Sequence, residues 1–228
     1  MKIPIIVVSC EWPSTRDRGA SQITQAIART FVDNVAIWNA NTGSVFEIIR
    51  FFGHSVRRES VEAFLNSLRK RKALFVFYGH GCSCGSSLLE SLDVSDAIPN
   101  PLLDCDNSET LQNKVVYVVA CHSARTFGPN AIRDGAISYI GYTGRVVVSI
   151  NGQRLKGIEK CLNAGLAVLV ERGGCSAAAR DAIYRQYTYY IEKHWSENAG
   201  ASPYIIAMSM NRRCLVPQAI GSQIARIR

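Results

Sequence analysis

Residues 74–81 read LFVFYGHG, an apolar run of strand length that stops at a histidine, His80, held between two glycines. The same design recurs further along the chain, where residues 115–120 read VVYVVA and Cys121 follows at once. Continuous apolar runs of this length are typical of parallel strands that are covered on both faces. Because ligands bind at the carboxyl edge of a parallel sheet, the two runs predict a histidine and a cysteine at a ligand-binding edge.

Length and composition indicate one folded domain. The chain has 228 residues, which suits a single α/β domain over residues 1–228. Hydrophobic residues make up 47% and charged residues 19%, so a disordered chain is excluded. The longest apolar runs have strand length, so we expect no membrane span and no membrane partner. Residues 1–8, MKIPIIVV, contain an apolar segment that is too short for a secretory signal. They are predicted to form the first strand.

The eight cysteines do not resemble the disulfide framework of a small secreted protein. Cys121 and Cys161 lie in apolar runs, and a free cysteine is often a buried residue. Without a secretory signal, we expect a reduced, cytoplasmic compartment. Such a compartment would leave Cys121 free to act as a thiolate.

The net charge of +8 comes from several clusters, namely Arg57-Arg58, Arg69 to Lys72, Arg212-Arg213 and Arg226 with Arg228. Basic surfaces attract nucleic acids and acidic partners. However, no aromatic residue is interleaved with these clusters and no nucleic-acid motif is present. We therefore read them as solvated surface and do not expect a nucleic-acid partner.

Strand-like and helix-like stretches alternate along the chain, which predicts an α/β fold: a three-layer sandwich with a mostly parallel central sheet and helices on both faces. Besides the two runs above, expected strands lie at residues 3–9, 35–38, 136–142, 203–210 and 214–216. Expected helices lie at residues 20–31, 61–68, 157–170 and 176–194, with a short one after Ser44 that includes Phe46, Ile49 and Arg50.

His80 and Cys121 have the chemistry of a nucleophile and its base. A catalytic cysteine must be a thiolate or be activated by a nearby base. Cys121 precedes Ser123, a candidate helix cap, and helix N-terminal amides favour a thiolate. On a neighbouring strand, about 4.8 Å away, His80 would polarise the thiol or protonate a leaving amine. The N–H groups of Gly81 and Cys121 would form an oxyanion hole, which predicts a cysteine endopeptidase acting through a thioester acyl-enzyme.

Two short motifs add a family resemblance. Residues 78–81, YGHG, and 120–124, ACHSA, resemble the His-Gly and Ala-Cys motifs of clan CD cysteine peptidases. The Ala-Cys-x-Ser-Ala form is most similar to the CHAT and separase-like branch, and the match covers residues 73–144. The resemblance implies a caspase-like fold, a protein or peptide substrate, a His80/Cys121 dyad, and Gly81 and Cys121 as oxyanion donors.

This sequence also departs from its relatives. Val119 stands where caspases carry Gln and metacaspases Asp, two residues before the nucleophile. No regulatory or repeat domain of the kind often attached to CHAT proteases is recognisable, so we include a regulatory protein among the expected partners.

The substrate pocket is expected at the same sheet edge. Glu11 and Asp17, in the loop after the first strand, would suit a basic residue before the scissile bond. Arg16 and Arg18 in the same loop would suit an acidic residue at that position. The later loop of Tyr142 and Thr143 is expected to form a wall of the substrate pocket. By analogy with separase and gingipain, we expect basic specificity.

Two other interpretations remain open, and a third is disfavoured. The chain can be a catalytically silent caspase-like adaptor, because both dyad residues can be present in a closed site. Cys82-x-Cys84, with Cys105, Cys121 and His122, can supply zinc ligands, although C-x-C is tighter than the usual zinc spacing. A dinucleotide-binding domain is disfavoured, because the glycines lack the G-x-G-x-x-G spacing, and no cofactor is expected.

Overall fold

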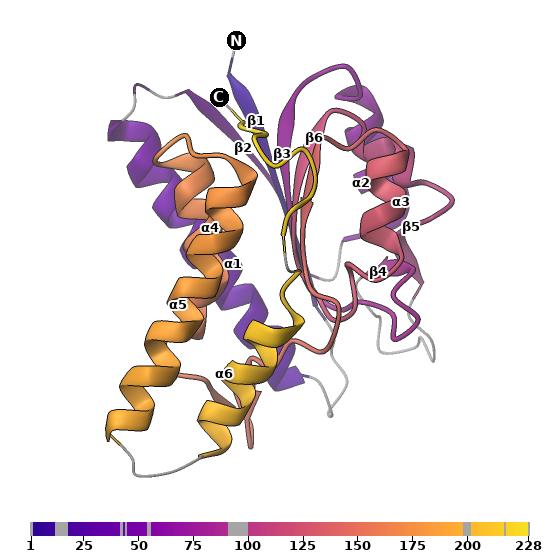
Figure 1. Ribbon diagram of the computed structural model, residues 1–228. Coiled ribbons are helices and arrows are strands. Elements are labelled where there is room, and N and C mark those ends of the chain that lie inside the picture. The colour runs from indigo at the N-terminus through magenta and orange to yellow at the C-terminus, as the bar shows by residue number, and fades with distance from the viewer. Residues whose placement is uncertain are drawn as a thin grey trace.

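The run that ends at His80 forms strand β3 (Ala73–Tyr78), which lies inside a six-stranded sheet (Figure 1). The strand order is β10-β7-β6-β3-β1-β2. Neighbouring strands are parallel except β10 and β7, which pair antiparallel. Helices cover both faces of the sheet (Figure 1). The expected class, an α/β fold with a mostly parallel central sheet between helices, is confirmed.

The computed structural model describes residues 2–11, 18–41, 43, 45–53, 56–90, 100–197, 202–216 and 218–227. Within these ranges the elements are, in chain order, β1 (Ile3–Cys10), α1 (Arg18–Asn41), β2 (Phe46–Gly53), α2 (Arg58–Ser67), β3 (Ala73–Tyr78), β4 (Ser87–Leu89), β5 (Pro101–Asp104), the 3-10 helix η1 (Ser108–Leu111), β6 (Lys114–Val119), α3 (Phe127–Arg133), β7 (Ser138–Ile140), β8 (Ser149–Ile150), β9 (Gln153–Arg154), α4 (Ile158–Val170), α5 (Ser176–Glu197), α6 (Pro203–Cys214) and β10 (Ile220–Gly221).

The core has one layer on each side of the sheet. Every residue of β3 and β6 is buried, as the two continuous apolar runs predict. Side chains of a strand alternate between its faces. Leu74, Val76 and Tyr78 pack with α1, α4, α5 and α6, whereas Phe75 and Phe77 pack with α2, α3 and the β4-β5 hairpin. The helices expected at residues 157–170 and 176–194 are confirmed as α4 and α5.

The strand expected at residues 35–38 is wrong, because these residues continue helix α1. Ile27, Phe31 and Val35 are all fully buried, and their spacing of four residues places them on one helical face. The helical stripe therefore extends through the short apolar run that we took for a strand.

The short helix expected after Ser44 is also wrong. Residues 46–53 form β2, an edge strand that pairs with β1 in parallel along its whole length, from Ile3–Phe46 to Cys10–Gly53. Helix and strand periods are hard to separate in so short an apolar segment, and pairing with β1 decides in favour of the strand.

The late strand pair expected at residues 203–210 and 214–216 is replaced by helix α6. The side chain of Ser202 caps this helix, since its Oγ accepts the N–H of Ile205 at 3.4 Å, and Pro203 occupies the first turn. Met208 and Asn211, three residues apart, are fully buried on its inner face. Beyond the helix, Leu215 forms an isolated bridge with Tyr142.

Candidate active site

His80 and Cys121 lie just past the carboxyl ends of two neighbouring strands. Strands β3 and β6 pair in constant register from Ala73–Lys114 to Tyr78–Val119, and the N–H of Gly79 donates to the Val119 carbonyl at 3.2 Å. The same register continued by two residues sets His80 opposite Cys121. Parallel strands lie about 4.8 Å apart, so both residues emerge side by side at one edge of the sheet.

Both residues also belong to the same face of the sheet. Tyr78 and Val119 pack into the core layer under α1, α4 and α5, and side chains two residues further on point the same way. His80 and Cys121 line one small pocket, with a volume of about 50 Å3. The other lining residues include four that sequence reasoning did not identify, Ala20, Thr24, Val146 and Val148.

The sulfur of Cys121 is half-buried and receives a backbone hydrogen bond. The N–H of Val146 donates to Cys121 Sγ at 3.3 Å, and the same Sγ lies 4.0 Å from the Val146 carbonyl oxygen. Ser123, the candidate helix cap, does not cap a helix, because the next helix, α3, begins at Phe127 with Thr126 at its N-cap. The amide beside the sulfur therefore comes from the loop after β7, which no local sequence signal indicates.

Gly81 brings the loop after β3 against the backbone of Cys121. A Cβ atom added to Gly81 would lie 2.0 Å from the Cys121 carbonyl oxygen, so only glycine fits. Gly81 bridges Leu88, and the hydrogen bonds of this bridge are made by its neighbours: Cys82 N–H donates to Ser87 O and Leu89 N–H to His80 O, both at 3.0 Å. Within the described parts of the chain, neither the Gly81 N–H nor the Cys121 N–H has a protein acceptor.

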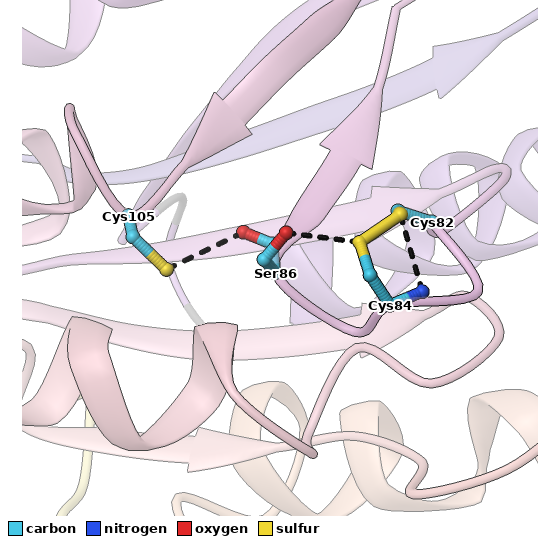
Figure 2. Close-up of a disulfide and its surroundings, with 4 residues drawn as sticks. All are labelled: Cys82, Cys84, Ser86 and Cys105. Carbon is cyan, nitrogen blue, oxygen red and sulfur yellow. Dashed lines mark hydrogen bonds between the residues drawn. A yellow bond between two sulfur atoms is a disulfide. The ribbon is translucent and has the colours of Figure 1, made fainter.

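The next residues of this loop carry a disulfide between Cys82 and Cys84 (Figure 2). The two sulfurs considered as zinc ligands are thus bonded to each other, and the described residues contain no cluster of three metal-ligating side chains. Cys84 Sγ lies 3.0 Å from Ser86 Oγ, and Cys105 Sγ lies 3.6 Å from the Ser86 carbonyl oxygen (Figure 2). The other six cysteines, Cys105 and Cys121 among them, are free.

The disulfide loop also contacts the segment after Cys121. The carbonyl of Gly85 accepts the N–H groups of Thr126 and Phe127 at 3.3 and 2.9 Å. A Cβ on Gly85 would lie 2.9 Å from the His122 carbonyl oxygen. The turns that follow the two strands therefore form one packed unit at the carboxyl edge of the sheet.

Of the two carboxylates expected to bind substrate, Glu11 is described and Asp17 lies outside the described residues. Glu11 follows β1 and is half-buried. Its Oε2 lies 3.6 Å from the position of a Cβ added to Gly53, at the end of β2. Glu11 therefore shares the carboxyl edge with His80 but does not line the pocket of His80 and Cys121.

The loop of Tyr142 and Thr143 does not form the expected wall. Tyr142 is 1% exposed, and its hydroxyl lies 3.3 Å from that of Tyr187, so its side chain is part of the core. Burial raises the pKa of Tyr142 above its usual range. Thr143 is exposed, donates its N–H and its hydroxyl to the Cys214 carbonyl at 2.7 and 3.1 Å, and lines a separate hollow of about 370 Å3.

His122, next to Cys121, has a structural role in this loop. Its φ of 57° is in the left-handed region, and its N–H donates to the Gly144 carbonyl at 2.8 Å. The ring nitrogen Nδ1 lies 3.4 Å from the Thr143 carbonyl oxygen. His122 therefore orders the turn after Cys121.

Neither a protein-family model nor a curated protein matches the chain. Among solved structures, the chain is similar to a secreted C11 cysteine protease from Bacteroides thetaiotaomicron, called iotapain, with a TM-score of 0.47 and 12% sequence identity. The match covers 83% of this chain and 63% of that protease, so this chain spans less than two thirds of its length. In the described parts of the chain, no helix combines the length and the apolar character that crossing a membrane requires.

Proposed function

We propose that the chain is a cysteine endopeptidase with a caspase-like fold, in which His80 and Cys121 form the catalytic dyad. The observation that carries the proposal is the shared register and shared face of these two residues at the ends of β3 and β6, where they line one pocket. The motifs around them favour clan CD and, within it, the CHAT and separase-like branch.

In the proposed reaction, Cys121 gives its thiol proton to His80, and its sulfur attacks the carbonyl carbon of the scissile peptide bond. A C–S bond forms, and the carbonyl electrons move to the oxygen. When the tetrahedral intermediate collapses, the C–N bond breaks and His80 returns the proton to the leaving amine. Water then attacks the thioester, with His80 as base, which releases the carboxylic acid and restores the thiol.

The amides of Gly81 and Cys121 are the proposed oxyanion donors. Both N–H groups lack a protein acceptor in the described residues, so they are available to a developing oxyanion. Loss of one such donor typically slows the reaction by about a hundredfold to a thousandfold. The close approach of Gly81 to the Cys121 carbonyl supports a joint role for the two loops.

We further propose that the substrate carries a basic residue before the scissile bond. The support is the carboxylate of Glu11 at the same edge of the sheet, because a carboxylate pairs with an arginine or lysine side chain. The pocket of about 50 Å3 at the dyad is too small for such a side chain, so this residue would lie outside it, towards β1. Glu11→Gln should then raise KM for basic substrates and leave cleavage after other residues unchanged.

The test is a cleavage assay with short peptides that end in Arg, Lys, Asp or Asn before a fluorescent leaving group. Cleavage by the wild type, its loss in His80→Ala and Cys121→Ala, and a slower alkylation of Cys121 in His80→Ala are the expected results. His122→Asn is the matched control, because asparagine tolerates the left-handed backbone and the variant should keep its activity.

If neither short peptides nor unfolded proteins are cleaved and Cys121 reacts with alkylating agents no faster than Cys175, a free half-buried thiol, the peptidase proposal is wrong. The silent adaptor would then be the better interpretation. Cleavage that survives Cys121→Ala would also refute the proposed nucleophile.

A further inference from the structure

A second hollow lies in the outer helical layer, away from the His80–Cys121 pocket. It has a volume of about 520 Å3 and is bordered by α1, α4 and α5, which pack against one another on one face of the sheet (Figure 1). Small-molecule sites typically measure about 300–1,000 Å3. Thr24 of the dyad pocket and Trp38 of this hollow are both on α1, about 21 Å apart along the helix axis at 1.5 Å per residue.

Small residues on the helices create the hollow. Ala164 and Ala167, three residues apart on α4, and Ala182 on α5 line it. The floor beside them is fixed by Asn163, whose Oδ1 accepts the Tyr78 hydroxyl at 2.6 Å and whose Nδ2 donates to the Ile27 carbonyl at 3.2 Å. The hollow therefore lies on a rigid floor that is bonded to both α1 and β3.

Three cations line this hollow without a partner. Lys160 lies near the start of α4, Arg172 just beyond its end, and Arg185 on α5. Within the part of the chain that the structure describes, none of the three side chains makes an ion pair or a hydrogen bond, and no acidic residue lines the hollow. Arg58, by contrast, is paired with Asp104 at 2.8 Å. The hollow thus offers uncompensated positive charge to an anion.

Two aromatic side chains border the same hollow from opposite helices. Trp38 comes from α1 and is half-buried beside Phe31, with ring centroids 6.4 Å apart. Tyr189 comes from α5, is 52% exposed and contacts Tyr190 edge to face at 5.3 Å. Exposed aromatic faces stack with planar rings, and nucleobases use this contact in sequence-tolerant sites.

We propose that this hollow, which we call the α1–α4–α5 groove, binds a phosphorylated nucleoside. Arg185, with either Lys160 or Arg172, would hold the phosphates, because guanidinium and ammonium groups donate charge-assisted hydrogen bonds to phosphate oxygens. Trp38 would stack on the base. The side-chain amides of the lining residues Asn34 and Gln186 supply donors and acceptors for the base edge.

The proposal concerns a nucleotide and stands apart from the basic clusters of the sequence. Lys160, Arg172 and Arg185 are separated along the chain and are brought to one groove only by the packing of α4 and α5. A ligand that carries both a phosphate and a base can be a free nucleotide or the end of a single-stranded nucleic acid. The groove does not depend on the peptidase activity, since none of its residues lines the dyad pocket.

The test is isothermal titration calorimetry of the full chain with ATP, GTP, pyrophosphate and a short single-stranded oligonucleotide. We expect a nucleotide to bind, and Arg185→Ala and Trp38→Ala each to weaken binding roughly tenfold or more, as loss of one charge-assisted bond or one stacked ring predicts. Arg29→Ala removes an exposed charge from α1 outside the groove and should change nothing. Ala164→Leu fills the groove without changing the charge and should abolish binding, with folding checked by thermal unfolding.

Each outcome decides the proposal. Binding of the oligonucleotide but not of ATP or GTP, still dependent on Trp38 and Arg185, would identify the end of a strand as the source. Pyrophosphate that binds as tightly as ATP would refute the role of the aromatic side chains, and with it the nucleoside. No binding of any probe, or binding unaffected by Ala164→Leu and Arg185→Ala, would refute the groove as the site.

Discussion

Gly81→Ala tests, with a single methyl group, the contact between the loops that carry the proposed dyad, His80 and Cys121. The φ of Gly81 is outside the left-handed region, so alanine can adopt this backbone conformation. The substitution is therefore opposed only by the contact of the new Cβ with Cys121. The new Cβ would lie 2.0 Å from the Cys121 carbonyl oxygen, whereas ordinary contact begins at 3.4 Å. The atom met is a backbone atom, so a side-chain rotation cannot relieve the clash.

The magnitude follows from that distance. To reach ordinary contact, the two loops must separate by about 1.4 Å, and a displacement of about 1 Å at a catalytic group costs roughly a hundredfold in rate. The strain of one extra buried methyl group is about 1–3 kcal/mol, less than the 5–15 kcal/mol by which domains are typically stable. The variant should therefore fold and still lose most of its activity.

The assay is kcat/KM on the best peptide substrate, together with the alkylation rate of Cys121 followed by mass spectrometry. Gly19→Ala is the matched control: no atom lies within 4 Å of its added Cβ, and it lies in the first turn of α1, so both rates should stay at the wild-type level. A Gly81→Ala variant that cleaves and alkylates as fast as the wild type would show that the approach of the two loops has no role in the reaction.

Two further predictions concern the stability of the chain. Lys114 is buried, and its Nζ donates to three backbone carbonyls, so Lys114→Met should lower the free energy of unfolding by roughly 3 kcal/mol or more in chemical denaturation; a loss below 1 kcal/mol would contradict it. Burial lowers the pKa of Lys114 from 10.5 to about 8. Between these two pH values the unfolded chain therefore binds more protons than the folded chain, so the free energy of unfolding should rise with pH. The wild type should show this rise, and Lys114→Met should not. Thiol titration of the unreduced, denatured chain should find six of the eight cysteines reactive, and eight reactive thiols would mean that the disulfide does not form. Replacing Cys82 and Cys84 by serine should lower the free energy of unfolding by roughly 1.5 kcal/mol, the loop-closure value for so short a ring.

Local patterns in the sequence were sufficient for the inner part of the fold. The buried runs at residues 74–78 and 115–119 are apolar throughout, so their strand character and central position follow from composition alone. Helices α4 and α5 follow from length and apolar content. Where a short apolar segment fits both periods, as in β2 and α6, the sequence was misread, because pairing with β1 and burial against the sheet decide between strand and helix.

Some residues of the candidate site could be placed from the sequence, and others could not. His80 and Cys121 could be assigned to one edge, because residues at the carboxyl ends of neighbouring parallel strands must meet there. Tyr142 was misplaced, since its burial against Tyr187 depends on how α5 packs. The donor at Val146 and the α1–α4–α5 groove were not identifiable from the sequence.

The apolar strands and the residues at their ends can be read from local patterns, because period and hydrophobicity act within a few residues of the chain. Which loop amide reaches the Cys121 sulfur, and which cations share one groove, depends on tertiary packing. Those contacts join segments that are distant along the chain, and such contacts depend on how helices pack on the sheet rather than on any local preference.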